Sequence, residues 1–100
     1  MKIYIAGKIS DDPNYKQKFQ AKTEQLRSIG YKVLSPAVLP LGFEHDEYLR
    51  ICYAMIDVCD GVYLLEDWRE SKGARLEREY AVKNNKMLVY EPKISASVMR

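Results

Sequence analysis

The chain has 100 residues, of which 47% are hydrophobic and 30% charged, and its formal net charge at pH 7 is +2. These values predict a single globular domain over residues 1–100, with one core and little area for a deep pocket unless a second copy helps to form it. The small, scattered positive charge argues against polymeric nucleic acid as a partner. No signal peptide or long apolar run is visible, which predicts a cytoplasmic protein that does not enter a membrane.

Cysteine and histidine are too few to predict a metal site. Cys52 and Cys59 are the two cysteines, and their spacing of seven within a helical segment is typical of buried free thiols. His45 is the one histidine, and it does not provide a zinc ligand set. We expect His45 in a solvated loop just before a helix that Asp46 caps, in preference to a catalytic role.

Strand and helix patterns alternate along the chain. A strand is expected at residues 2–6. The helix that follows is expected to have Asp11 or Asp12 as its N-cap, Pro13 in its first turn and Gly30 at its end. The remaining elements are expected at residues 31–35 (strand), 36–45 (loop), 46–59 (helix), 61–65 (strand), 71–83 (helix) and 86–90 (strand). The pattern of the last eight residues does not distinguish between a short strand, a helix and a tail.

This alternation is typical of an α/β fold with a parallel sheet and helices on both faces. We expect a Rossmann or flavodoxin-like domain with four or five strands in the order 2-1-3-4. Ligands of such sheets bind beyond the carboxyl ends of the strands, between strands 1 and 3. Residues 7–12 and 66–72 would meet there, and the long loop 36–45 emerges at the same edge.

A carboxylate in the third predicted helix is the main candidate for chemistry. Glu77 lies one turn beyond Gly73 and one turn before Ala81, so it shares a helix face with small residues that let a ligand approach. Most glutamates on helices are simply solvated or ion-paired, and that interpretation stays open. Ser71 at the start of the helix is suited to capping it, to binding an anion, or to both.

Two short motifs resemble the nucleoside 2-deoxyribosyltransferase-like superfamily. The first is Tyr4-Ile-Ala-Gly7 followed by Lys-Ile-Ser10, and the second is Ser71-Lys-Gly73-x-x-x-Glu77. The resemblance spans nearly the whole chain and is greatest to a short bacterial and phage family of unknown function. It implies cleavage or exchange of the N-glycosidic bond of a deoxyribonucleoside or its 5′-monophosphate, without a metal or organic cofactor.

The resemblance also implies roles for individual residues. Glu77 would be the nucleophile that attacks the sugar C1′, Tyr4 would orient it, and a second protomer would complete the site. Serine at position 71 is typical of the branch that acts on nucleotides, where it contacts the 5′-phosphate. The substrate-binding residues that follow from the motifs and the predicted switch point are Gly7, Lys8, Ile9, Ser10, Asp67, Trp68, Ser71, Lys72 and Gly73.

One position departs from the family pattern. Relatives carry an acid eight residues before the aspartate that matches Asp60, and it helps to protonate the leaving base. Here that position holds Cys52, so Asp57, Asp67 or Glu47 would have to serve instead. An inactive nucleotide-binding module, or a small interaction protein with a vestigial pocket, therefore remain the alternatives to an enzyme.

Structural roles compete with the functional ones at other positions. Tyr4 lies in a buried strand and is suited to the core as well as to catalysis. Trp68 is either a lid that stacks on a base or a packed anchor for its loop. Lys72 and Arg75 either add positive charge for a phosphate or pair with acidic neighbours on the helix, and we expect only pairing for Arg78.

Overall fold

Strands and helices alternate along residues 1–92, the part of the chain that the computed structural model describes. In order, the elements are β1 (Lys2–Ala6), α1 (Tyr15–Ser28), β2 (Lys32–Leu34), the 3-10 helix η1 (Pro36–Val38), α2 (His45–Asp57), β3 (Gly61–Leu64), the 3-10 helix η2 (Trp68–Glu70), α3 (Lys72–Lys83) and β4 (Met87–Tyr90). All four predicted strands are present, and the prediction for the last eight residues lies outside the described part.

The four strands form one parallel sheet in the order β2-β1-β3-β4, which confirms the predicted order and the flavodoxin-like fold. Tyr4 pairs with Leu34 on one side and with Val62 on the other, so β1 is central. The chain passes from β1 to β2 in one direction and reaches β3 on the opposite side of β1. This reversal opens a crevice at the carboxyl ends of β1 and β3.

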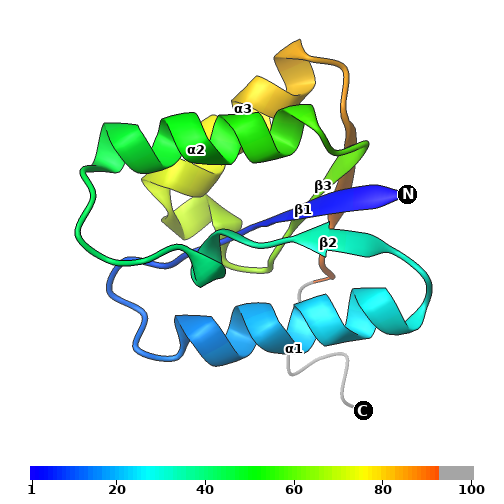
Figure 1. Ribbon diagram of the computed structural model, residues 1–100, viewed down its shortest axis with the longest axis horizontal. Helices are drawn as coiled ribbons and strands as arrows, with labels where there is room; N and C mark the ends of the chain where they lie inside the picture. The colour runs from blue at the N-terminus through cyan, green and yellow to red at the C-terminus, as the bar shows by residue number, and fades with distance from the viewer. Residues whose placement is uncertain (93–100) are drawn as a thin grey trace.

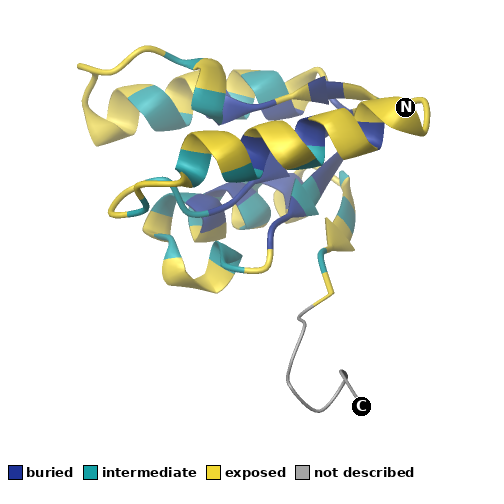
Figure 2. Ribbon diagram, turned by 90° about the horizontal axis from the view of Figure 1, so that it is seen from below, coloured by how far each residue is buried: buried dark blue, intermediate teal, exposed yellow. Residues whose placement is uncertain are grey.

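Helices cover both faces of the sheet, with α1 on one face and α2 and α3 on the other (Figure 1). Side chains alternate along β1: Ile3 and Ile5 pack with Phe19 of α1, whereas Tyr4 and Ala6 belong to the core below α2 and α3. Figure 2 shows the buried residues between the layers and the exposed residues on the outer helix surfaces. Tyr4 therefore lies under the two helices that frame the crevice.

Helices α2 and α3 are held together by aromatic packing. The rings of Tyr53 and Tyr80 stack with centroids 4.1 Å apart, and the Tyr80 hydroxyl donates to Asp57 Oδ1 over 2.6 Å. These contacts fix how the two helices lie against each other. Asp57 is thereby engaged at the carboxyl end of α2, the end opposite His45.

Two predicted helix starts were wrong. Helix α1 begins at Tyr15 rather than after a cap at Asp11 or Asp12, because the Asp12 carboxylate accepts from the Asn14 amide in a turn that precedes the helix. Helix α2 begins at His45 rather than after Asp46.

The start of α2 has a capping box. The Glu44 amide donates to Glu47 Oε1 over 2.8 Å, and the Glu44 side chain accepts from the backbone of Glu47 in return. His45 is therefore the first helical residue and not part of a loop. The end of α1 follows the prediction, since Gly30 adopts a φ of +101°. No helix within residues 1–92 is both long and apolar enough to cross a bilayer.

Candidate active site

Tyr4 and Glu77 meet in the core, although 73 positions separate them in the chain. The Tyr4 hydroxyl donates to Glu77 Oε2 over 3.0 Å, and both side chains are buried. Tyr4 comes from the central strand and Glu77 from the second turn of α3. Because both elements are fixed by packing, the carboxylate is held in a defined orientation.

Burial raises the pKa of Glu77 from an ordinary value of 4.5 to about 7, while hydrogen bonding from Tyr4 and Cys52 opposes the rise. Burial also raises the pKa of Tyr4 well above its ordinary value, and the charge of Glu77 adds to this effect. Tyr4 thus stays protonated and acts as a donor. Glu77 is poised between its neutral and charged forms near neutral pH, as a reactive carboxyl group would be.

Cys52 lies beside this pair on α2. Its side chain is buried, and burial together with the charge of Glu77 raises its pKa to about 12. The thiol is therefore neutral at physiological pH. A group with so high a pKa is a weak proton donor. Cys52 is therefore poorly suited to replace the acid that relatives carry at this position.

Glu77 and Cys52 line a pocket of about 360 Å³ at the carboxyl edge of the sheet. Its other lining residues come from the β1–α1 connection, the segment after β2, and the starts of α1, α2 and α3: Gly7, Ile9, Ser10, Tyr15, Pro36, Leu39, Leu41, His45, Tyr48, Leu49, Ser71, Gly73 and Ala74. The pocket thus lies at the predicted switch point. The Glu77 carboxyl group in its lining comes from α3, and the His45 imidazole and the Cys52 thiol come from α2.

The predicted substrate-binding residues divide into two groups. Gly7, Ile9, Ser10, Ser71 and Gly73 line the pocket with Glu77, and Tyr4 lies beneath it. The other four are outside the lining: Lys8, Asp67, Trp68 and Lys72.

Trp68 packs against the core that lies under α2 and α3. Its ring centroid lies 5.8 Å from that of Tyr90, and the Arg78 guanidinium lies 5.4 Å from the Trp68 ring. Arg78 also donates to the Tyr90 hydroxyl over 2.7 Å, so it has a partner other than the acidic neighbours that we expected. These contacts fit the packed anchor better than the lid.

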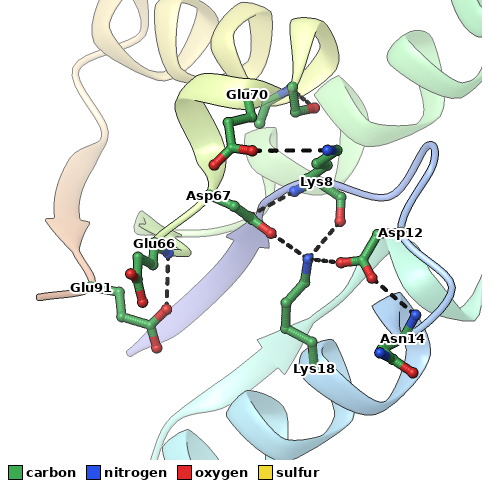
Figure 3. Close-up of polar contacts among 10 residues, drawn as sticks. Lys8, Asp12, Asn14, Lys18, Glu66, Asp67, Glu70 and Glu91 are labelled. Atoms are coloured by element: carbon green, nitrogen blue, oxygen red, sulfur yellow. Dashed lines mark hydrogen bonds and ion pairs between the residues drawn. The ribbon is translucent and has the colours of Figure 1, made fainter. Parts of the chain in front are cut away.

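A cluster of ion pairs joins the two loops that border the pocket (Figure 3). The Lys18 ammonium contacts both Asp12 and Asp67, and it donates to the Lys8 carbonyl over 2.9 Å. The Lys8 amide in turn donates to Asp67 Oδ1 over 3.0 Å. Asp67 therefore fixes the β1–α1 connection to the β3–α3 connection, and its carboxylate is already occupied by Lys18.

Close packing against Leu65 leaves no room for a side chain at Gly7. A Cβ at this position would lie 2.6 Å from Leu65 Cδ1 and 3.0 Å from Leu65 Cβ, and Leu65 is itself buried. We expect Gly7→Ala to lower the free energy of unfolding by about 1–3 kcal/mol, because the core has no room for the added methyl group.

Urea denaturation measures this effect, and Gly73→Ala is the matched control. A Cβ on Gly73 would find its nearest neighbours at 3.7 Å and 3.9 Å, which are ordinary contact distances. Equal stability of Gly7→Ala and the unaltered protein would contradict the packing argument.

Ser71 caps α3. Its Oγ accepts from the Ala74 amide over 3.1 Å. The hydroxyl hydrogen remains able to donate to a ligand, so capping and anion binding are compatible. This confirms the predicted position of Ser71 at the start of the helix.

His45 and Tyr48 line the pocket but were not among the predicted site residues. The signal that would have revealed them is the spacing of Glu44 and Glu47, which forms the capping box and places His45 on the helix. Glutamate is not a common N-cap residue, so this start is easily overlooked.

A family model described as "Domain of unknown function (DUF4406)" matches residues 1–90. The chain belongs to this family. No curated protein matches the chain. Among solved structures, the DUF4406 domain is similar to a "2-desoxiribosyltransferase from Leishmania mexicana", with a TM-score of 0.71 and 20% sequence identity.

That match covers 89% of this chain and 62% of the other, so the DUF4406 chain spans less than two thirds of its structural neighbour. At 20% identity the likeness shows a shared fold. It confirms the deoxyribosyltransferase-like fold that the two motifs implied.

The Tyr4 hydrogen bond in this DUF4406 domain has a measurable consequence. We expect Tyr4→Phe to raise the pKa of Glu77 further, by roughly 1, because the charged carboxylate loses a donor while burial stays. Carbon-13 NMR of labelled glutamate side chains, followed across pH, measures it. Tyr80→Phe is the control, since its hydroxyl bonds to Asp57 instead. An unchanged or lower pKa in Tyr4→Phe would contradict the assigned role.

Proposed function

We propose that this DUF4406 protein breaks or exchanges the N-glycosidic bond of a 2′-deoxynucleoside or its 5′-monophosphate, with Glu77 as the nucleophile. The observation that carries this proposal is the buried Glu77 carboxyl group, held by Tyr4 at the wall of a pocket and with a pKa near neutrality. The likeness in fold to a protein named as a deoxyribosyltransferase supports it.

The reaction would proceed in two displacements. Glu77 Oε2 is held by Tyr4, so the other oxygen would attack C1′ of the sugar. The bond between C1′ and the base nitrogen breaks, and its electron pair leaves with the base, which takes up a proton from solvent water. Water or a second base then attacks C1′ and releases the carboxylate, which gives hydrolysis or transfer respectively.

The pocket offers separate surroundings for the parts of such a substrate. Apolar side chains, including Ile9 and Leu39, are suited to a base, and Ser10 to a polar edge of the base or sugar. Ser71 and the backbone of Gly73 lie at the start of α3, where a phosphate would find donors. Of the predicted binding residues, we retain those that line the pocket: Gly7, Ile9, Ser10, Ser71 and Gly73.

A second copy of the chain would complete the pocket in this proposal. Leu41 lines the pocket yet is 79% exposed. Burial of this apolar rim by another protomer would exclude water from the reacting atoms. Sedimentation velocity over a range of protein concentrations shows whether the protein is a dimer.

None of the three acids that could replace the family's proton donor is placed to protonate the leaving base, and this favours a second candidate function. Asp67 is bound by Lys18, Asp57 accepts from Tyr80, and Glu47 takes part in the capping box. None of these three lines the pocket. A module that binds a nucleotide without cleaving it would need no such donor.

Chromatography for free base tests the proposal. The protein is incubated at high concentration with a panel of deoxyribo- and ribonucleosides and their 5′-monophosphates, and melting temperature is followed in parallel. Release of base from at least one deoxy compound supports the enzyme. A rise in melting temperature without any release supports the binding module instead.

A further inference from the structure

We infer that His45 binds the 5′-phosphate of the substrate and thereby makes the pocket prefer nucleotides over nucleosides. This inference deepens the proposed function and rests on it. His45 is outside both motifs that resemble the deoxyribosyltransferase-like superfamily, and it enters the pocket from α2 rather than α3.

The first support is the space above Gly73. A Cβ built on Gly73 would lie 3.7 Å from Cε1 of His45 and 3.9 Å from Oγ of Ser71. The imidazole and the hydroxyl thus border the same small volume, which stays open because residue 73 has no side chain. Both residues also line the pocket.

The second support is charge. Among the described residues that line the pocket, His45 is the one whose side chain can become a cation. A phosphate that binds near the Glu77 carboxylate is repelled by its negative charge. A positively charged side chain in the pocket would offset this repulsion. Lys8 and Lys72 do not line it, and the Lys8 ammonium lies 3.9 Å from Glu70.

The third support is the distance from the reacting group. Gly73 precedes Glu77 by one helical turn, a rise of about 6 Å along the axis. This is comparable with the separation of the phosphorus and C1′ in a nucleoside 5′-monophosphate. A substrate with C1′ at Glu77 would therefore place its phosphate between His45 and Ser71.

The Tyr48 hydroxyl, which also lines the pocket, is already engaged. The Tyr48 hydroxyl donates to the Pro40 carbonyl over 2.6 Å and accepts from the Phe43 amide over 3.3 Å. Ser71 already accepts from Ala74 and retains one hydrogen to donate. His45 and Ser71 are therefore the side chains best placed to hold a phosphate here.

The test compares ligands that differ only in the phosphate. The background is the Glu77→Gln protein, in which turnover is blocked. Calorimetry measures how tightly this protein, with and without the further change His45→Ala, binds a 2′-deoxynucleoside and its 5′-monophosphate. We expect His45→Ala to weaken the monophosphate roughly tenfold to a hundredfold, as for a lost hydrogen bond to a charged group, and to leave the nucleoside unchanged. Arg50→Ala, which removes a positive charge from an exposed position on α2, is the control.

The outcomes separate this inference from the proposed function. In protein that retains Glu77, we expect His45→Ala to raise KM for the monophosphate and to leave kcat unchanged. His45→Lys should restore part of the lost affinity. Equal losses for both ligands, or a fall in kcat for both, would overturn the phosphate role and indicate a donor to the leaving base. Absence of binding and of base release with every compound would overturn the proposed function itself.

Discussion

Replacing Glu77 with glutamine is expected to reduce base release at least about a thousandfold. Glutamine keeps the size of the side chain and can still accept from Tyr4, but its amide cannot form the covalent bond to C1′. Binding should survive, because the pocket walls are unaltered. Single-turnover chromatography with the best substrate of the panel measures the rate.

Glu79→Gln is the matched control for this prediction. Glu79 lies on the same helix and is exposed, so its substitution should change the rate little. If Glu77→Gln retained more than about a tenth of the rate, Glu77 would not be the nucleophile.

The same substitution should also change how stability depends on pH, whether or not the protein is an enzyme. The pKa of Glu77 is raised in the folded protein from 4.5 to about 7 by burial. Between these values the folded state holds a proton that the unfolded state has released, so the free energy of unfolding falls as pH rises. The loss attributable to Glu77 is about 3 kcal/mol and is complete above the folded pKa.

Glutamine does not titrate, so Glu77→Gln lacks this loss. We expect its stability relative to the unaltered protein to increase by about 3 kcal/mol between pH 4.5 and pH 8. Glu77 is only 7% exposed, so solvent screening reduces the effect little. Urea denaturation of both proteins across this range measures the difference. A constant difference would mean that the carboxyl group titrates normally in the folded protein.

The sheet was predictable because its signals are local. Apolar runs bounded by Gly7, Gly30 and Gly61 mark the strands, and alternation with helices leaves few parallel topologies to consider. The start of α1 was missed because the Asp12 carboxylate binds Asn14 and Lys18. A single sequence does not show which of several nearby donors will form a hydrogen bond with a given carboxylate.

The candidate site was predictable only in part. The pairing of Tyr4 with Glu77 came from resemblance to a family, since nothing local connects residues so far apart. His45 was missed because its helix starts with an uncommon cap. Trp68 does not line the pocket because η2 intervenes between β3 and α3, and no local pattern predicted this short helix.

The most direct test of the proposed chemistry is the stereochemistry of the product. Proton NMR follows a 2′-deoxynucleoside 5′-monophosphate incubated with the protein in water containing methanol. Attack by Glu77 followed by methanol inverts C1′ twice, so we expect free base and a methyl glycoside that retains the β configuration. The α anomer, or no base at all, would contradict a glycosyl-enzyme formed on Glu77.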